Sequence, residues 1–378
     1  MKIVADANIP YVRECFSSIG EVTAMSGREM TPWIVADADI LLVRSITPVG
    51  VDLLAGSKVR FVATATIGFD HIDLDFLRQN KIGFASAPGS NANSAAEYII
   101  AGLLKIGQRH HIELEGTSIG VIGVGNVGTR VVAKAEALGM TVVRNDPPKL
   151  DATGDPKFRP VDEALACDVV TLHVPLTTEG PYPTAGMVDE SFLERIKPGA
   201  IFINTSRGPV VSDAALSAAL SAKHIDAAVL DVWQGEPAID LDLLRLVEIA
   251  TPHIAGYSYD GKVRATLMLY RSLCEHLGCR PKWNPDPAMP PPPNPCITPA
   301  AKGGQTAVMQ AATCAYDILF DNRNLREELS MRPDLAAIHF DGLRKYYRAR
   351  REFPCFTVRC VWNGNLAQSV AALGFKTE

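Results

Sequence analysis

Residues 117–146 carry the feature that most constrains this chain, a glycine-rich turn between an apolar strand pattern and a helical pattern. The apolar run Ile119–Ile122 has the length of a buried parallel strand, and the segment GVGNVG follows it directly. Glycines at this spacing suit a tight strand-to-helix turn. Gly123 permits the turn, Gly125 lets a pyrophosphate approach the backbone, and Gly128 lets the helix pack closely on the strand. We therefore predict a dinucleotide-binding unit here, and a glycine-rich turn without a ligand is the alternative.

The residues after this turn predict which dinucleotide binds. The first N–H groups of the helix, at Asn126 and Val127, would face the pyrophosphate. A second β-branched run, Thr141–Val143, leads to Asp146, which stands eighteen residues after Gly128. A carboxylate at this place accepts hydrogen bonds from a ribose diol and repels a 2′-phosphate. The prediction is therefore NAD rather than NADP.

At 378 residues the chain is long enough for two or three domains. Over residues 1–90, short apolar strand patterns alternate with helical ones, which indicates a parallel sheet with crossover helices. These expected strands are Lys2–Ala5, Ile40–Val43, Phe61–Ala65 and Ile82–Ala85. The alternation resumes after Asp146 and predicts a six-stranded doubly wound domain. Its later strands are expected at Val169–His173, Ala200–Asn204, Ala227–Leu230 and Val247–Ala250.

Two long helical patterns indicate how these parts are joined. Ser94–His110 leads out of the first domain, with Asn93 or Ser94 as N-cap and Glu97 at capping-box spacing from Ser94. A second pattern, Val263–His276, leads back to it. The predicted domains are a discontinuous substrate (lid) domain, residues 1–93 and 257–280, an NAD-binding domain, residues 94–256, a proline-rich linker, residues 281–299, and a C-terminal dimerisation domain, residues 300–378.

The linker differs from the rest of the chain because nine of its nineteen residues are prolines, which exclude helix and indicate a stiff extended segment. Beyond it we expect a helix at Gly304–Leu319, a basic amphipathic stretch at Leu343–Glu352 and a strand at Phe356–Val361. The predicted fold class is therefore α/β. A Rossmann-type doubly wound parallel sheet is inserted into a discontinuous flavodoxin-like α/β substrate domain, and a small α+β domain follows at the C-terminus.

Charge and cysteine content exclude several classes of function. The net charge of −5 gives no general attraction to nucleic acid or to an anionic membrane, and no apolar run approaches the roughly 20 residues that span a bilayer. The eight cysteines form no CxxC motif and no zinc-ligand spacing with histidines, so we expect reduced thiols and no metal site. The chain starts without a signal-peptide pattern, and the expected location is cytoplasmic.

Three segments that follow successive predicted strands supply the groups that hydride removal from an alcohol requires. They are NTSRG with Arg207, DVWQGEP with Glu236, and TPHIAGY with His253. Imidazole accepts a proton near neutral pH, a carboxylate orients it, and a guanidinium binds a substrate carboxylate and polarises the reacting oxygen. We therefore assign His253 as acid/base, Glu236 as its partner and Arg207 as anchor and electrophile. Each residue alone is more typical of a solvated turn.

Small polar residues also follow two strands of the first domain. Ser45 stands after Ile40–Val43, and Thr66 stands after Phe61–Ala65. Ligands of open α/β sheets lie beyond the carboxyl ends of strands, so both are candidate substrate contacts. The alternative is that each caps the helix that follows it.

These motifs together resemble the D-isomer-specific 2-hydroxyacid dehydrogenase family over residues 35–275. The segments that carry the resemblance are ATATIGFDHID, SNANSAAEYI, NTSRGPVV, LDVWQGEP, PHIAGYSYDGKVRAT and, near the C-terminus, FDGLRKYYRARREF. The resemblance implies Arg207, Glu236 and His253 as catalytic residues. It implies cofactor contacts at Asn126, Val127, Asp146, Thr205, Ser206, Arg207, Asp231 and Gly256, and substrate contacts at Ser45, Thr66 and Tyr257. Val174 departs from the family, where a threonine often touches the cofactor.

Within the family, the late segments resemble the branch that oxidises 4-phosphoerythronate to 3-hydroxy-2-oxo-4-phosphobutanoate with NAD, a step of pyridoxal 5′-phosphate synthesis. The implied substrate is a small phosphorylated 2-hydroxy acid, and we expect Arg44 to help hold its phosphate. The basic run Arg344–Arg351 is a second candidate, reaching across from a partner subunit, and a solvated helix face is its alternative. The resemblance also implies a homodimer that forms through the C-terminal domain.

Three other functions remain open at this point. One is a related dehydrogenase that acts on 3-phosphoglycerate or glycerate. Another is an NAD-sensing binding protein, like the transcriptional corepressors that share this fold and can retain all three catalytic residues. A methyltransferase is the third, but it would lack the Arg207 and His253 loops. The acidic charge balance and the segment Tyr257–Thr266 favour the dehydrogenase.

Overall fold

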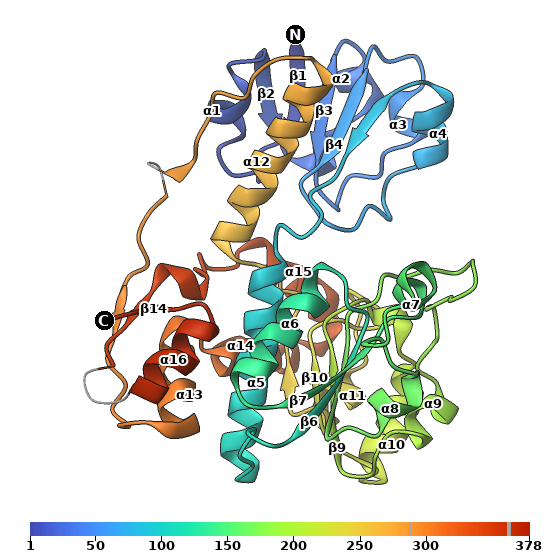
Figure 1. Cartoon of the computed structure of the whole chain (residues 1–378). Helices are drawn as coiled ribbons and strands as arrows, with labels where there is room; N and C mark the ends of the chain where they lie inside the picture. Colours follow the sequence, from blue (N-terminus) through green and yellow to red (C-terminus); the bar gives the residue numbers. More distant parts are fainter. Residues whose placement is uncertain (287–288, 361–363) are drawn as a thin grey trace. The chain divides into compact units, whose positions relative to one another are not determined.

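The computed structural model of the chain describes residues 1–286, 289–360 and 364–378. Residue contacts divide it into two compact units. The first unit comprises Met1–Asn91 and Ser258–Pro290, and the second comprises Ala92–Tyr257 and Pro291–Glu378. Figure 1 shows both units with their helices and strands labelled.

The first unit contains a five-stranded parallel sheet in the order β2-β1-β3-β4-β5, which is the flavodoxin-like order. Its strands are β1 (Lys2–Asp6), β2 (Glu21–Met25), β3 (Ile40–Val43), β4 (Phe61–Thr64) and β5 (Gly83–Ala85). Its helices are α1 (Val12–Phe16), α2 (Pro32–Val35), α3 (Val51–Leu54), α4 (Leu74–Gln79) and α12 (Tyr259–His276), with a 3₁₀ turn η1 (Gly27–Glu29).

The central strands of this sheet are mostly buried and apolar because both faces are covered. In β3, Ile40 and Leu42 pack in the cluster with α1 and α12, while Leu41 packs in the opposite cluster with α2, α3 and α4. The edge strand β2 is mostly exposed or half-buried, so its sequence lacks this apolar signal. The sequence analysis accordingly did not predict it.

The second unit contains a six-stranded parallel sheet in the order β11-β10-β9-β8-β6-β7, as predicted for a doubly wound fold. Its strands are β6 (Ser118–Ile122), β7 (Thr141–Asn145), β8 (Val169–Leu172), β9 (Ala200–Asn204), β10 (Ile225–Leu230) and β11 (Ile249–Ala250). The associated helices are α5 (Ala92–His110), α6 (Asn126–Ala137), α7 (Pro147–Thr153), α8 (Val161–Leu165), α9 (Glu190–Glu194), η2 (Gly208–Val210), α10 (Asp213–Ser221) and α11 (Leu241–Leu246). Alternate residues of a strand serve the two cores, because Ile201 and Ile203 pack with α5 and α6 whereas Phe202 packs with α8, α9 and α10.

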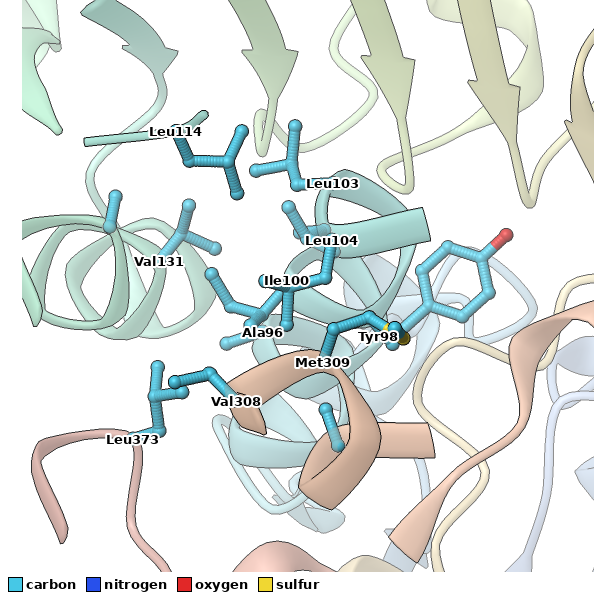
Figure 2. Close-up of a cluster of buried hydrophobic side chains, with 14 of the residues drawn as sticks. Ala96, Tyr98, Ile100, Leu103, Leu104, Leu114, Val131, Val308, Met309 and Leu373 are labelled. Carbon is cyan, nitrogen blue, oxygen red and sulfur yellow. The ribbon is translucent and has the colours of Figure 1, made fainter. Parts of the chain in front are cut away.

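Residues 291–378 fold onto this same unit. They form β12 (Cys296–Ile297), α13 (Gly304–Ala315), α14 (Ile318–Met331), η4 (Pro333–Leu335), α15 (Ala336–Lys345), η5 (Phe353–Cys355), β13 (Thr357–Val358), α16 (Gly364–Ala372) and β14 (Lys376–Thr377), and the three strands make a small parallel sheet. Figure 2 shows Val308 and Met309 of α13, together with Leu373, beside Ile100 and Leu104 of α5. The predicted fold class is confirmed, and the predicted division into four segments remains a prediction.

The capping box proposed for the long helix is wrong. Helix α5 begins at Ala92, so Ser94 and Glu97 lie inside it, and both are fully buried. The Glu97 carboxylate accepts hydrogen bonds from the Asn93 amide, at 2.8 Å, and from the backbone N–H of Phe353, at 2.9 Å. A tertiary contact with the C-terminal segment therefore replaces the predicted local one.

The C-terminal elements also differ from their predicted limits. The helix predicted over Gly304–Leu319 ends at Ala315, because Tyr316 is extended and Asp317 caps a new helix, α14. Helix α15 ends at Lys345, and the solvated helix face proposed for the following basic residues is wrong because Arg350 and Arg351 are buried. Within the predicted strand Phe356–Val361 only Thr357–Val358 is a strand, and Val361 lies outside the described residues.

Candidate active site

The glycine-rich turn after β6 holds two glycines that the protein itself requires. Gly123 has a φ of +87°, and a Cβ atom there would lie 2.7 Å from the backbone of His173. A Cβ atom on Gly128 would lie 2.0 Å from the carbonyl oxygen of Gly123. These two positions therefore set the sharp turn and the close packing of α6 on β6, as predicted.

Gly125 differs, because neither its backbone conformation nor its protein neighbours require a glycine. Its φ is −77°, and a Cβ atom there would meet no described atom within 4 Å. The residue is exposed and is followed by Asn126 and Val127, the first residues of α6. Open space at the N-terminus of a twelve-residue helix fits a pyrophosphate that approaches the backbone closely.

Asp146 stands at the end of β7, next to this turn. Its carboxylate accepts a hydrogen bond from the backbone N–H of Val124 at 2.9 Å, and it caps α7 by accepting one from Lys149 N–H at 3.1 Å. The half-buried side chain thus links the glycine-rich turn to the adjacent strand end. A carboxylate oxygen has more than one lone pair, so these bonds leave Asp146 able to accept from a ribose diol.

The loop after β9 carries three predicted residues. Ser206 is buried and donates both its N–H and its hydroxyl to the Asn204 amide oxygen, at 3.0 and 2.7 Å. Arg207 donates from Nη1 to the carbonyl oxygen of Ser206 at 2.8 Å. The Thr205 hydroxyl is buried and has no hydrogen-bond partner within the described ranges. A polar atom left in this state is expected where a ligand completes the site.

The loops after β10 and β11 bring together the predicted carboxylate and imidazole. Glu236 Oε2 lies 2.7 Å from His253 Nδ1, and Glu236 Oε1 accepts from the backbone N–H of Trp233 at 2.9 Å. The side chain of His253 is 32% exposed and that of Glu236 is 20% exposed. Burial opposes ionisation of Glu236, yet the charge of His253 and its hydrogen bond, with Arg344 as a weaker contribution, lower the pKa of Glu236 below its ordinary value.

The backbone of the His253 loop is held by Asp231. His253 has a left-handed φ of +56°. Its N–H donates to the carbonyl oxygen of Asp231 at 2.7 Å, and the N–H groups of Ile254 and Ala255 donate to the Asp231 carboxylate at 2.7 and 2.9 Å. Three bonds to one residue stabilise a conformation that non-glycine residues seldom adopt.

Asp231 is itself fully buried, and burial raises its pKa. Thr251 donates its hydroxyl to Asp231 at 2.6 Å, and the Tyr98 hydroxyl lies 2.7 Å from that of Thr251. Trp233 Nε1 donates to the carbonyl oxygen of Thr251 at 3.0 Å. The sequence analysis missed Tyr98 and Thr251, because neither a tyrosine in an apolar helix nor a threonine at a strand end predicts such a partner.

Residues from the C-terminal segment reach the same loop. Arg350 Nη1 donates to the carbonyl oxygen of Ala255 at 3.1 Å, and its Nη2 donates to that of Ser94 at 2.7 Å. Gly256 and Tyr257, which follow in the loop, are half-buried. The Tyr257 ring meets the Tyr347 ring edge-on at 5.9 Å between centroids.

The remaining predicted substrate residues belong to the first unit. Ser45 is exposed and Arg44 is half-buried after β3, while Thr66 follows β4, whose Thr64 pairs in register with Val43. Neither polar residue caps a helix: α3 starts after Gly50, and α4 is capped by Asp73. The capping alternative for Ser45 and Thr66 is therefore wrong.

The positive charge of Arg44 acts on Lys262, a second cation of the first unit. Burial, and then the positive charge of Arg44, lower the pKa of Lys262 to about 8. Lys262 lies in the first turn of α12, which is capped by Ser258. Two positive groups in mutual electrostatic reach are suited to an anionic ligand.

Neither a metal site nor a membrane-spanning helix was found in the part of the chain that the structure describes. No group of three or more His, Cys, Asp or Glu side chains there is arranged to hold a metal ion. Every described helix is too short or too polar to cross a bilayer. All eight cysteines are free thiols.

Comparison with known proteins agrees with this geometry. Residues 91–255 match the family model described as D-isomer specific 2-hydroxyacid dehydrogenase, NAD binding domain, and residues 288–374 match a domain of unknown function, DUF3410. The chain is 48% identical to the erythronate-4-phosphate dehydrogenase of Salinibacter ruber, over 95% of this chain and 94% of the relative. It is 41% identical to the protein of the same name from Escherichia coli O1:K1 / APEC, over 99% and 98%.

The chain belongs to the erythronate-4-phosphate dehydrogenase branch of the D-isomer-specific 2-hydroxyacid dehydrogenases.

The dehydrogenase fold extends to solved structures of the wider family. The D-lactate dehydrogenase of Aquifex aeolicus, complexed with NAD and lactic acid, is 25% identical with a TM-score of 0.60, over 74% of this chain and 96% of that one. The matched NAD-binding domain confirms NAD as the cofactor of this dehydrogenase. Gly125, Asn126 and Val127 lie at the start of α6 within that domain, and Asp146 is bonded to the same turn through the N–H of Val124.

Proposed function

We propose that this dehydrogenase oxidises 4-phosphoerythronate to 3-hydroxy-2-oxo-4-phosphobutanoate with NAD, as a step of pyridoxal 5′-phosphate synthesis. The observation that carries the proposal is the Glu236–His253 pair, joined at 2.7 Å on the loops after β10 and β11. It lies in a chain 48% identical over nearly its whole length to a protein named erythronate-4-phosphate dehydrogenase. The acid/base pair supplies the chemistry of alcohol oxidation, and the likeness supplies the substrate.

In this proposal His253 takes the proton of the substrate's C2 hydroxyl. The hydrogen bond from Nδ1 to Glu236 leaves Nε2 as the atom that accepts this proton. Glu236 carries a negative charge, and it stabilises the imidazolium that results. NAD, when bound, supplies the acceptor for the C2 hydride.

Arg207 is proposed to bind the substrate carboxylate and to polarise the C2 oxygen. Its guanidinium follows β9 and donates from Nη1 to the carbonyl oxygen of Ser206, and a guanidinium forms a bidentate pair with a carboxylate. Thr205, Ser206, Asp231 and Gly256 are proposed cofactor contacts. Because Ser206 and Asp231 are both buried with donors and acceptors already engaged, their contribution would be mainly to hold the loops that contact NAD.

The first unit is proposed to supply further substrate contacts. Ser45 and Thr66 follow adjacent strands, and neither serves as a helix cap. Arg44 is proposed to help hold the substrate phosphate together with other cations, and its positive charge near Lys262 supports an anion there. Tyr257 of the second unit is the fourth proposed substrate contact.

The first experiment is NADH formation, followed at 340 nm, when 4-phosphoerythronate is added to purified protein and NAD. A parallel assay contains a 2-oxo acid as acceptor, because tightly held NADH would otherwise hide turnover. Oxidation of 4-phosphoerythronate in either assay is the expected result. Turnover with D-glycerate or 3-phosphoglycerate but not with 4-phosphoerythronate would refute the substrate and retain the dehydrogenase.

We also propose a homodimer that forms through the C-terminal residues. Large apolar side chains are exposed on α14, on α15 and directly after α15, and Phe320, Ile338 and Tyr346 line a groove of about 580 Å³. These side chains are Phe320 at 41%, Met331 at 74%, Ile338 at 68% and Tyr346 at 78% exposure. Light scattering after size-exclusion chromatography should give twice the chain mass for the wild type and a monomer for Ile338→Asp combined with Tyr346→Asp. A monomeric wild type would exclude the dimer.

A further inference from the structure

Arg344 occupies an unusual position for a surface arginine in a C-terminal helix. It lies in the last turn of α15, and its side chain is 23% exposed. Nη2 lies 3.5 Å from the hydroxyl of Tyr257, and the guanidinium carbon lies 6.0 Å from the centroid of the Tyr257 ring. Arg344 therefore faces the residue that ends the His253 loop, within the same chain and the same unit.

The guanidinium of Arg344 is only loosely satisfied by the protein. Its Nε is buried and has no hydrogen-bond partner among residues 1–286, 289–360 and 364–378. The acidic group paired with it, Asp341, lies 3.9 Å away, at the outer limit of an ion pair. The Tyr257 hydroxyl at 3.5 Å is likewise at the limit of a hydrogen bond.

Neighbouring arginines of the same segment are held by shorter contacts, although the Nε of Arg350 is likewise buried without a hydrogen-bond partner in the described part of the chain. Arg348 pairs with the buried carboxylate of Asp321 at 3.2 Å. Arg350 donates to two backbone carbonyl oxygens, at 2.7 and 3.1 Å, and its guanidinium carbon lies 3.7 Å from the Tyr316 ring centroid. The guanidinium nitrogens of these two bind protein oxygens at 2.7 to 3.2 Å, whereas those of Arg344 reach protein oxygens only at 3.5 and 3.9 Å, which leaves them suited to a ligand.

The electrostatic surroundings of Arg344 identify the kind of ligand. Its positive charge is one of those that keep Glu236 ionised, so it stands within electrostatic reach of the catalytic pair. The proposed substrate brings a carboxylate and a phosphate close to that negative carboxylate. Such a site requires a cation to offset the repulsion, and a guanidinium binds phosphate oxygens through two parallel N–H donors.

We infer that Arg344 is a substrate-binding residue that holds the phosphate group of the bound hydroxy acid, together with the hydroxyl of Tyr257. The inference rests on the proposed function and deepens it, because Arg207 is already assigned to the carboxylate. It also gives the DUF3410 segment, residues 288–374, a role in the active site of its own chain.

The test compares Arg344→Met with Arg344→Lys and with the control Arg359→Met. Methionine keeps much of the apolar contact with Tyr257. Lysine keeps the positive charge but lacks the two parallel N–H donors of a guanidinium. Arg359 belongs to the same segment, but its side chain is 50% exposed and pairs with Glu378 at 3.2 Å. Circular dichroism and thermal unfolding of each variant establish that it is folded before kinetics are measured.

For Arg344→Met we expect the KM for 4-phosphoerythronate to rise about 10- to 100-fold while kcat falls less than about threefold, since one charge-assisted contact is lost. Inorganic phosphate should inhibit the wild type competitively, and its Ki should rise by a similar factor. The Ki of erythronate, which lacks the phosphate, should change less than about twofold. The KM of Arg344→Lys should lie between those of the wild type and Arg344→Met. The KM of Arg359→Met should match that of the wild type.

Three outcomes would overturn the inference. An unchanged KM in a folded Arg344→Met variant removes Arg344 from substrate binding. An equal rise in the Ki of erythronate and phosphate assigns Arg344 to the carboxylate instead. A loss confined to kcat makes it a residue that acts on the catalytic pair. If the wild type does not oxidise 4-phosphoerythronate at all, the proposed function fails before Arg344 is tested by KM, and phosphate inhibition with the true substrate then decides its role.

Discussion

The second unit contains two regions that use charged side chains in opposite ways. In the sheet region, residues 92–257, the charged catalytic side chains follow strand ends and stay partly exposed, with His253 at 32% and Glu236 at 20%. In the C-terminal region, residues 291–378, Arg350 and Glu352 are buried at 3% and 2% exposure. His253 and Glu236 are therefore accessible to ligands, whereas Arg350 and Glu352 contact segments that are distant in the chain.

Arg350 shows how the two regions depend on each other. It joins the Ala255 carbonyl of the catalytic loop to the Ser94 carbonyl of α5, and it lies 4.0 Å from the Glu97 carboxylate. The His253 loop is therefore held by Asp231 of the sheet region and by Arg350 of the C-terminal region. Arg350 lies outside the matched NAD-binding domain. A residue there can therefore support the proposed chemistry by holding the His253 loop, without touching substrate.

The largest expected effect is a loss of activity when the partly exposed Glu236–His253 pair is broken. His253→Ala should lower kcat by about 10²- to 10⁴-fold, because it removes the base that takes the hydroxyl proton. Stability should change little, since the ring is partly exposed and its loop is held through the backbone. Steady-state kinetics with a thermal-unfolding control measure both quantities. Activity within tenfold of the wild type would show that another group takes the proton.

The next effect concerns the buried arginine. Arg350→Met should lower the free energy of unfolding by about 3 kcal/mol, because two buried carbonyl oxygens and the Glu97 carboxylate lose their partner. Arg359→Met, on an exposed ion pair, should cost less than about 1 kcal/mol. Urea unfolding of both variants makes the comparison. Similar losses of unfolding free energy in the two variants would show that the buried contacts of Arg350 stabilise the fold no more than an exposed ion pair does.

Two glycines of the turn after β6 are needed for different reasons. We expect Gly125 to be required for ligand binding and Gly123 for folding. Gly125→Ala should keep the stability of the wild type and weaken NAD binding about 10- to 100-fold, because its Cβ atom enters space that only a ligand would fill. Gly123→Ala should destabilise the fold by about 2 kcal/mol or more, owing to its φ of +87° and the contact with His173. Titration calorimetry and thermal unfolding distinguish them. Unchanged NAD affinity in Gly125→Ala would place the pyrophosphate elsewhere.

The last effect is a pH dependence of stability, which arises from one buried acid. Burial, reinforced by the Glu352 carboxylate and opposed by Lys134 and Arg350, raises the pKa of Glu97 from 4.5 to about 8. Between these values the folded chain keeps a proton that the unfolded chain has released. Folding stability therefore falls as pH rises from about 4.5 to about 8.

Glu97→Gln removes this titration, so its Tm should decline less than that of the wild type between pH 5 and pH 8. Melting curves at several pH values check the difference in slope. Parallel declines of Tm in the two proteins would show that Glu97 is ionised throughout.

Local sequence patterns predicted most of the sheet region. The strands Ile40–Val43 and Ala200–Asn204 have the predicted limits, because a parallel strand covered on both faces is a short apolar run with sharp ends. The order of Arg207, Glu236 and His253 after successive strands predicted that they meet at one sheet edge. The structure confirms the contact between Glu236 and His253 at 2.7 Å.

The C-terminal region was predicted less well for a physical reason. Its strands are two residues long, which leaves no periodicity to detect. The basic run Arg344–Arg351 looks amphipathic in sequence, but Arg350 is buried by contacts with Ala255 and Ser94, which stand 95 and 256 residues away. No local pattern carries information about such partners.

By itself, the sequence predicted the fold class, the glycine-rich turn of an NAD-binding domain and the pairing of Glu236 with His253. Those features depend on short segments in which backbone geometry and chemistry are set by neighbours in the chain. Only the tertiary structure decided that Glu97 is a buried partner of the C-terminal segment, that Asp231 holds the His253 loop, and that Arg344 faces Tyr257. The physical reason is that burial and hydrogen-bond partners of these charges are supplied by residues far away in sequence.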